Sequence, residues 1–262
     1  MNEHPVKISL RGLTKSFGKK HVLRNLDLDI FQGDSVAIIG PSGTGKSVLL
    51  KNIVGIQTPD SGSIKIDSEE VVGLTGNARD RVNRNLGMLF QGAALFDSLS
   101  LWENVGFGLM SAHGVSRSNA RQAAIDGLQQ VGLDAGSADR FPADISAGAQ
   151  KRVGLARAIA TNPEILFFDE PTTGIDPIMG DVIDNLIVKC VKELGATALT
   201  ITHDIESARR IADKVAMIHQ GKIAWVGDVD KIDVSGSEIV EQFIHGRFDG
   251  HMSQALIGTP AA

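Results

Sequence analysis

Short apolar runs alternate with amphipathic stretches along most of this chain. Runs rich in β-branched and other apolar residues predict strands, because such side chains pack well on a pleated, buried surface. The predicted strands are residues 6–10, 26–30, 35–39, 63–66, 86–90, 165–169, 197–202, 214–219 and 222–226. The runs around Ile39, Phe168 and Thr200 are β-rich and apolar, which is typical of parallel strands that are covered on both faces.

The early and late parts of the chain predict different layers. Only short turns, such as residues 17–20, separate the early strands, so we expect an antiparallel layer beside a mainly parallel core. Further along, the pattern is mainly helical, with the clearest helices at residues 116–131 and 148–160. The sequence therefore predicts an α/β fold with an inserted helical subdomain at about residues 92–160.

Composition limits the function classes that remain. The chain has 262 residues, 42% of them hydrophobic and 22% charged, which is ordinary for a globular α/β protein. A net charge of −5 without a basic patch gives no reason to expect a nucleic-acid partner. The one cysteine, Cys190, lies in a helical pattern at residues 182–194, where we expect a small buried side chain and no disulfide. We see neither a secretory signal nor an apolar run of about 18 residues, so we expect any membrane work to need a partner subunit.

The segment after the predicted strand 35–39 fits the phosphate-binding pattern G-x-x-x-x-G-K-[ST], and a predicted helix follows it. The glycines let backbone N–H groups point at phosphate oxygens, and the helix adds its positive N-terminal end. Lys46 can reach the β- and γ-phosphates, and the hydroxyl of Ser47 can ligate Mg²⁺. The strand–loop–helix setting argues against a chance glycine-rich turn. The predicted cradle consists of Gly40, Pro41, Ser42, Gly43, Thr44, Gly45, Lys46, Ser47 and Val48.

Two adjacent acids follow the predicted strand 165–169. An aspartate that ends a buried strand, here Asp169, can hold Mg²⁺ directly or through water. Glu170 is then placed to orient and polarise an attacking water molecule. The alternative is a surface acidic pair, which the presence of the phosphate loop disfavours.

Other residues could complete such a site. Gln91 follows the strand-like run 86–90 and could touch both Mg²⁺ and the attacking water. His203 follows the strand-like run 197–202 and could donate a hydrogen bond to a γ-phosphate. Ser146, followed by Gly148, opens a predicted helix whose N-terminal end is a second anion site. Each alone is more simply a loop glutamine, a structural histidine or a plain helix cap, so each depends on its neighbours.

Taken in order, these motifs resemble the nucleotide-binding subunit of an ATP-binding cassette (ABC) transporter. The resemblance covers about residues 6–230 and implies the P-loop ABC ATPase fold, ATP and Mg²⁺ as cofactors, and ATP hydrolysis. It also implies that two copies enclose two ATP molecules, with the phosphate loop of one copy facing the Ser146 segment of the other. Phe17 matches the aromatic residue that stacks on adenine, and Asp176 matches the family's dimer-contact loop.

The signature segment of this family is usually Leu-Ser-Gly-Gly-Gln, and this chain departs from it. Ala147 replaces the first glycine, and Ala149 stands in place of the glutamine. Ser146 and Gly148 are retained, and they supply the hydroxyl and the close backbone approach to phosphate. We therefore expect ATP hydrolysis to survive the change.

A narrower resemblance concerns residues 92–105 and 240–246. The first segment is similar to the loop of ATPases that serve mammalian-cell-entry (MCE) type lipid transporters, among them the maintenance-of-lipid-asymmetry (Mla) system. The second is similar to that subfamily's C-terminal extension, within a tail (231–262) that we expect to form a helix at 237–245 and to contact a dimer partner or another subunit. About half of the apolar residues after Gln91 are expected to pack inside, and the others to meet a permease. These residues are Leu95, Phe96, Leu99, Leu101 and Trp102.

The resemblance implies phospholipid transport at the cytoplasmic face of the inner membrane. Its implied partners are an integral membrane permease, a second copy of the chain, an MCE-domain substrate-binding protein and a small regulatory subunit. Three alternatives remain open. The same ATPase could power an amino-acid, ion or drug transporter. A soluble ABC ATPase of DNA repair or translation is disfavoured by the single cassette and the acidic charge. A GTP-binding switch is disfavoured by the Ser146 segment and His203.

Overall fold

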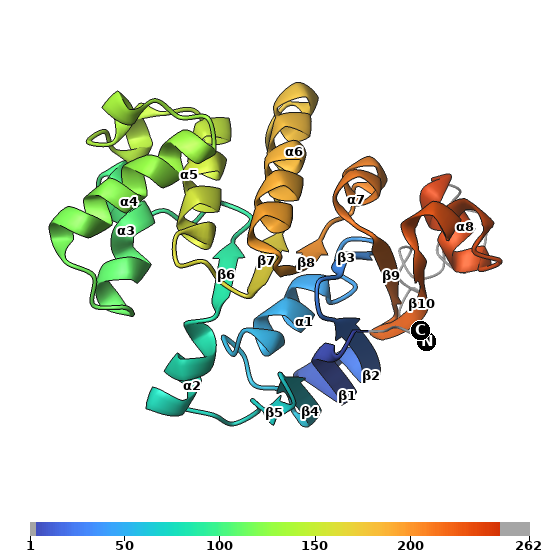
Figure 1. The fold of residues 1–262 in the computed structure, drawn as a ribbon. Helices are drawn as coiled ribbons and strands as arrows, with labels where there is room; N and C mark the ends of the chain where they lie inside the picture. The colour runs from blue at the N-terminus through green and yellow to red at the C-terminus, as the bar shows by residue number, and fades with distance from the viewer. Residues whose placement is uncertain (1–3, 247–262) are drawn as a thin grey trace.

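A computed structural model describes residues 4–246, which form two β-sheets flanked by helices (Figure 1). The smaller sheet is antiparallel, with strand order β2-β1-β4-β5. The larger sheet has the order β10-β9-β3-β8-β7-β6, in which β9 and β10 are antiparallel and the remaining pairs are parallel. The strands are β1 (Val6–Phe17), β2 (Lys20–Phe31), β3 (Ser35–Ile39), β4 (Ser61–Ile66), β5 (Glu69–Glu70), β6 (Leu86–Leu89), β7 (Ile165–Asp169), β8 (Thr197–Ile201), β9 (Lys214–His219) and β10 (Lys222–Asp228).

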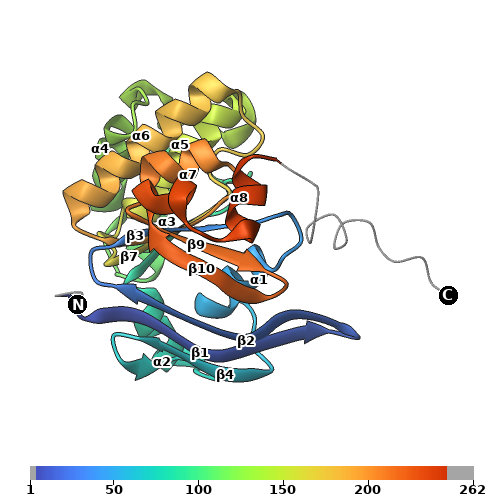
Figure 2. The same cartoon turned by 90° about the vertical axis from the view of Figure 1, so that its right-hand side faces the viewer.

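The helices cover the larger sheet and build a separate group at its β6 end (Figure 1). That group contains α3, α4 and α5, and α5 leads back into the sheet through β7. Figure 2 shows the smaller sheet on the far side of the large one from α6 and α7. The helices are α1 (Lys46–Ile53), α2 (Gly76–Asn83), α3 (Leu101–Ser111), α4 (Arg117–Gln130), α5 (Ala147–Ile159), α6 (Pro177–Leu194), α7 (Ile205–Ile211) and α8 (Glu238–Ile244), with short 3-10 turns at Ala135–Ser137, Pro142–Asp144 and Val229–Val234.

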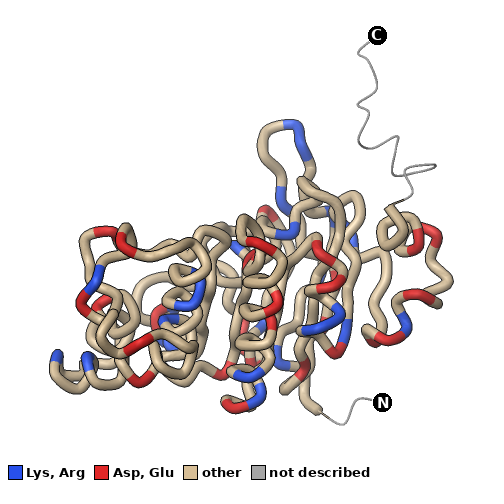
Figure 3. Tube along the Cα trace, turned by 90° about the horizontal axis from the view of Figure 1, so that it is seen from above, with Lys and Arg blue, Asp and Glu red and all other residues tan. Residues whose placement is uncertain are grey.

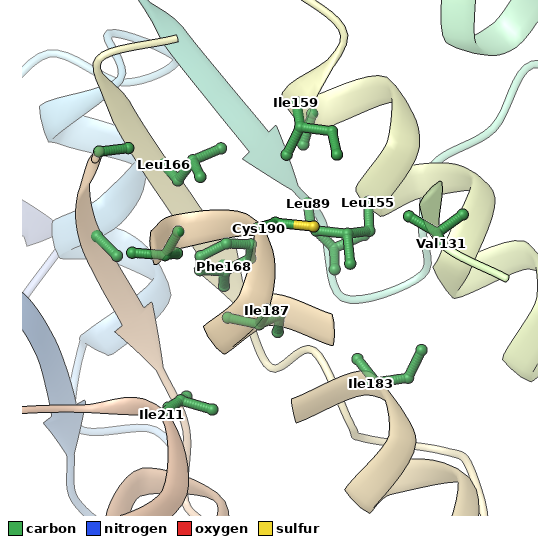
Figure 4. Close-up of a cluster of buried hydrophobic side chains, with 14 of the residues drawn as sticks. Leu89, Val131, Leu155, Ile159, Leu166, Phe168, Ile183, Ile187, Cys190 and Ile211 are labelled. Atoms are coloured by element: carbon green, nitrogen blue, oxygen red, sulfur yellow. The ribbon is translucent and has the colours of Figure 1, made fainter. Parts of the chain in front are cut away.

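The central strands are buried on both faces, and their side chains divide the core into two clusters. Phe168 of β7 packs in the cluster that includes residues of α5 and α6, whereas its neighbour Phe167 packs in the cluster that includes residues of α1 and the small sheet. This alternation follows from the two-residue period of a strand. Figure 4 shows the first cluster, in which Cys190 and Ile187 of α6 lie near Phe168. The apolar runs are therefore continuous because both faces of the sheet are covered.

The architecture confirms the predicted P-loop ABC fold class, with its parallel core, antiparallel layer and helices beyond β6. Every predicted strand is present, although β1 and β2 are longer than their apolar runs. The expected helix at 237–245 is confirmed as α8, while residues 247–262 of the predicted tail lie outside the described residues. The short strand β5 and the helices α2 and α7 were not predicted, because α2 is mostly polar and the other two are short.

Helix α6 begins earlier than its apolar pattern indicates. Pro177 occupies the first helical turn, and the carboxylate of Asp176 accepts a hydrogen bond from the N–H of Met179 at 2.9 Å. Proline and an N-cap aspartate are both signals of a helix start, so the start of α6 could have been predicted from the sequence.

Charged residues of both signs are spread over all of the described residues (Figure 3). Within residues 4–246, no helix is both long enough and apolar enough to cross a membrane.

Candidate active site

The phosphate loop lies between β3 and α1 and depends on its glycines. Gly40, Gly43 and Gly45 all have positive φ angles, which side chains disfavour. A Cβ on Gly40 would lie 2.5 Å from the carbonyl oxygen of Ile218, and one on Gly45 would lie 2.9 Å from Val22. The sequence folds this way because only glycine satisfies both the backbone conformation and the close packing on β2 and β9.

The ammonium of Lys46 lies inside this loop. Its Nζ donates hydrogen bonds to the carbonyl oxygens of Gly40 at 2.7 Å and Pro41 at 3.1 Å. The side chain is buried, and burial lowers the pKa of Lys46, while the nearby charges of Glu170 and Asp169 act in the opposite direction. The loop thus holds a cation where phosphate oxygens would meet the backbone N–H groups of the helix end.

Ser47 and Asp169 form a pair of oxygen donors. The hydroxyl of Ser47, in the first turn of α1, donates to Asp169 Oδ1 at 3.1 Å. Asp169 ends β7 and is buried, and burial raises the pKa of its carboxyl group while the hydrogen bond from Ser47 lowers it. A hydroxyl and a carboxylate are the hard oxygen ligands that Mg²⁺ prefers, so these residues fit a magnesium ion chemically.

Glu170 is held by contacts on both its backbone and its side chain. Its φ angle is 49°, a left-handed conformation that costs a non-glycine residue about 1–2 kcal/mol. Its N–H donates to the carbonyl oxygen of Ile201 at 2.8 Å. Its Oε2 accepts a hydrogen bond from Thr173 Oγ1 at 3.0 Å and lies 2.7 Å from His203 Nδ1. Strained backbone that is fixed by its surroundings is typical of reactive sites.

Most of the residues proposed for the site gather around one cleft of about 380 Å³. Lys20 and Val22 also line it, and sequence reasoning missed both, although the basic Lys20 follows Phe17 in the turn. The side chain of Phe17 is 48% exposed, and Lys15 Nζ lies 5.6 Å from its ring centroid. The remaining lining residues are Ser42, Gly43, Gly45, Lys46, Ser47, Val48, Gln91 and Glu170.

Other proposed residues lie beside this cleft or away from it. Pro41 and Thr44 line an adjoining cleft between the loop, β2 and the turn from β9 to β10, and Thr44 Oγ1 donates to the Pro41 carbonyl at 2.8 Å. Asp169 and His203 are joined to cleft residues by the contacts given above. Ser146 and Gly148 do not line the cleft of their own chain.

Ser146 is instead the exposed N-cap of α5. Its Oγ accepts a hydrogen bond from the N–H of Ala149 at 3.3 Å. Ala147 is exposed, whereas Gly148 is buried, and a Cβ on Gly148 would lie 2.7 Å from Cγ of Met179. The retained glycine therefore also serves packing within the chain.

The apolar residues after Gln91 divide as we expected. Leu101 and Trp102 are buried, with 0% and 5% of their surface exposed. Leu95 and Leu99 are partly buried, and Phe96 is 44% exposed. The ring of Phe96 lies 4.9 Å, centroid to centroid, from that of Phe107, which is also exposed. Two further residues near the site were missed: Thr173, and Lys151, a buried cation that the helical pattern of α5 did not distinguish from a surface lysine.

Comparison with known proteins shows the family to which the chain belongs. The family model described as ABC transporter matches residues 23–173. The chain belongs to the ABC transporter family of ATPases. It is accordingly an enzyme that binds and hydrolyses ATP, and ATPases of this family work as dimers joined to a membrane permease.

Two relatives and one solved structure are similar to this ABC ATPase over most of their length. It is 37% identical over 242 residues to the probable ribonucleotide transport ATP-binding protein mkl of Mycobacterium leprae, covering 92% of this chain and 70% of that protein. It is 36% identical over 250 residues to the intermembrane phospholipid transport system ATP-binding protein MlaF of Haemophilus influenzae, covering 95% and 94%. A dimeric ATP-binding cassette bound to ADP and Pi superposes with a TM-score of 0.78 at 31% identity, covering 85% of this chain and 98% of that one.

Proposed function

We propose that this ABC ATPase energises a membrane permease that moves phospholipids between membranes. The observation that carries this proposal is the match to MlaF, which spans nearly all of both chains. It agrees with the resemblance of residues 92–105 and 240–246 to MCE-type transport ATPases. The partners that we propose are the permease, a second copy of this chain, an MCE-domain protein and a small regulatory subunit, at the cytoplasmic face of the inner membrane.

The chain's own residues suggest how hydrolysis proceeds. The ammonium of Lys46 neutralises charge on the β- and γ-phosphates, beside N–H groups that need no reorganisation. Ser47 and Asp169, with Gln91 nearby, would hold Mg²⁺, which when bound polarises the phosphoryl oxygens. Glu170 accepts the proton of the attacking water, and His203 orients its carboxylate and donates to the γ-phosphate.

The other half of each site would come from the second copy. Ser146 and Ala147, at the N-terminal end of α5, are exposed, and no residue of the first turn of α5 lines the chain's own cleft. A helix N-terminus carries unpaired N–H groups and a positive partial charge, so it suits a γ-phosphate presented by a facing subunit. Phe17 would stack on adenine and Asp176 would lie at the dimer contact. ATP binding then closes the dimer, and hydrolysis opens it.

The exposed aromatic pair beside Gln91 supports docking of a permease. Phe96 comes five residues after Gln91 in the chain, and its ring meets that of Phe107 on α3, so the segment that leaves the nucleotide site presents an exposed aromatic pair on the helical group. Aromatic residues that are half exposed on an otherwise packed surface are typical anchors of an interface. We propose that a short cytoplasmic helix of the permease packs on Phe96 and Phe107.

Ribonucleotides are a second candidate substrate, because the mkl relative is named for ribonucleotide transport. The two substrates differ in chemistry, so one experiment separates them. The chain is purified with its native permease in nanodiscs, bound molecules are identified by mass spectrometry, and ATPase activity is measured with added phospholipid or ribonucleotide. We expect co-purified phospholipid and stimulation by lipid. Stimulation by ribonucleotides with no bound lipid would refute the phospholipid assignment and leave the ATPase assignment intact.

A further inference from the structure

A buried lysine on the signature helix α5 contacts the backbone of two residues that we assign to the hydrolytic site. Lys151 is only 4% exposed, and its Nζ donates to the backbone carbonyl oxygens of Gln91 and Glu170, the latter at 3.3 Å. Burying an ammonium costs free energy unless its N–H donors are hydrogen-bonded, so these two contacts offset the cost of burying Lys151. Lys151 does not line the nucleotide cleft.

The carbonyl of Gln91 is a firm anchor because the segment that follows it is docked on the same helix. Gly154 leaves room for Ala93, since a Cβ on Gly154 would lie 3.3 Å from the Cβ of Ala93. Arg157 then donates to the carbonyl oxygens of Ala93 at 2.6 Å and Ala94 at 2.7 Å. Spacings of three residues place Lys151, Gly154 and Arg157 along one side of α5.

The second carbonyl belongs to the residue whose side chain we assign as the base. Glu170 has a left-handed backbone conformation, and its N–H donates to the carbonyl oxygen of Ile201. Its own carbonyl oxygen accepts hydrogen bonds from the N–H of Thr173 at 3.2 Å and from the ammonium of Lys151. A change in this peptide orientation would turn the Cα–Cβ bond and move the carboxylate away from its position beside His203. Lys151 is the contact that ties this peptide to α5.

We infer that Lys151 is a positioning residue for hydrolysis, which holds the peptide of Glu170 in its reactive orientation by bridging it to Gln91. This inference rests on the proposed role of Glu170 as the base. Lys151 thereby attaches Gln91 and Glu170, which act on the chain's own ATP, to α5. The N-terminus of α5 carries Ser146, the residue proposed to serve the partner's ATP.

The test is a double-mutant comparison in the complex with the permease. Lys151→Met keeps the length and removes the donors, and it should lower kcat about tenfold or more, because a misplaced catalytic group loses effective concentration steeply. The KM for ATP should stay within about twofold, since Lys151 lies outside the cleft. Lys151→Arg, which keeps the charge and donors, should recover kcat to within about threefold of wild type.

The decisive measurement uses Glu170→Gln as the background, with residual hydrolysis followed in single turnovers. If Lys151 acts through Glu170, adding Lys151→Met should then change the rate by less than about twofold. Arg152→Met is the matched control, because it removes a part-buried cation of the same helix that donates to Gly132 and has no hydrogen bond to Glu170 or to the segment after Gln91. The loss of rate that this control causes should multiply the loss caused by Glu170→Gln, because the two changes act independently.

Several outcomes would overturn the inference. They are a wild-type kcat in Lys151→Met, or an effect that multiplies with Glu170→Gln as the control does. If Lys151→Met does not fold, by circular dichroism, the same comparison is made with Lys151→Gln, which keeps an N–H donor. A Glu170→Gln variant with near-wild-type turnover would instead refute the assignment of the base, which distinguishes the two failures.

Discussion

His203 Nδ1 lies 2.7 Å from Glu170 Oε2, although 33 positions separate the two residues in the chain. The contact arises because β7 and β8 are parallel neighbours, with Asp169 opposite Ile201, so the residues that follow each strand emerge side by side. The side chain that we assign to water activation is therefore held by the one that we assign to the γ-phosphate. Thr173, three residues after Glu170, donates a hydrogen bond to the same carboxylate oxygen.

Removing the carboxylate of Glu170 should separate binding from hydrolysis. Glu170→Gln should bind ATP and slow turnover about 10²- to 10⁴-fold, the usual contribution of a general base. ATP should then hold the dimer closed, which size-exclusion chromatography with ATP would detect. The control is Glu193→Gln, at an exposed carboxylate of α6. Turnover of the Glu170→Gln variant within about threefold of wild type, under about 1 kcal/mol of barrier, would contradict the assignment.

Lys46→Ala should weaken ATP binding and abolish turnover. The ammonium that the Gly40 and Pro41 carbonyls hold in the loop is lost, and with it a point charge for the β- and γ-phosphates. Isothermal calorimetry on Lys46→Ala and on Lys65→Ala, at an exposed lysine of β4, makes the comparison. An unchanged ATP affinity in Lys46→Ala would count against the phosphate-loop assignment.

A mixed dimer tests whether Ser146 acts across the interface. Pairing a Lys46→Ala chain with a Ser146→Arg chain leaves one composite site intact and one doubly broken. We expect measurable ATPase activity in the mixture and none in either homodimer. Equal inactivity or equal activity of all three would show that the proposed arrangement in trans is wrong or that the two sites are strictly coupled, and single-turnover measurements on the mixture separate these cases.

A charge on the exposed aromatic pair should release the subunit from its permease. Phe96→Asp should abolish co-fractionation with permease-containing membranes and leave ATP binding intact, since an aromatic anchor is worth about 2 kcal/mol or more. Ile56→Asp is the control, because Ile56 is also exposed but lies in the loop between α1 and β4. Retention of a folded Phe96→Asp variant on membranes would exclude this surface, and loss of folding would indicate packing instead.

Cys190 should be unreactive and should make stability depend on alkaline pH. The thiol is fully buried in the core, and burial raises the pKa of Cys190 to about 11. Between the ordinary thiol pKa, near 8.5, and about 11, the unfolded chain releases a proton that the folded chain retains, so the free energy of unfolding falls as pH rises. The loss across this window should be on the order of 3 kcal/mol.

Denaturant melts of wild type and Cys190→Ala at several pH values isolate the contribution of this thiol. The difference in unfolding free energy between the two proteins should shift in favour of Cys190→Ala from about pH 9 upward. A thiol reagent should label Cys190 only after unfolding. Rapid labelling of the native protein, or a pH-independent difference between the two proteins, would show that the thiol is accessible.

The sequence by itself determined the features that a few consecutive residues control. The phosphate loop could be predicted because its glycines, Lys46 and Ser47 act within one turn of backbone. The buried strands could be predicted because their apolar runs follow from being covered on both faces. The order of the motifs was enough to indicate the family, which the comparisons then showed.

Only the tertiary structure decided which distant groups meet. The chain order does not say that β7 lies next to β8, so the contact between His203 and Glu170 could not be derived from it. The helical pattern of α5 also gave no sign that Lys151 faces inward onto the carbonyls of Gln91 and Glu170. Likewise, Trp102 is buried and Phe96 is exposed because of how α3 packs on its neighbours. These relationships depend on strand order and helix packing, which join segments far apart in the chain and leave no local periodic signal.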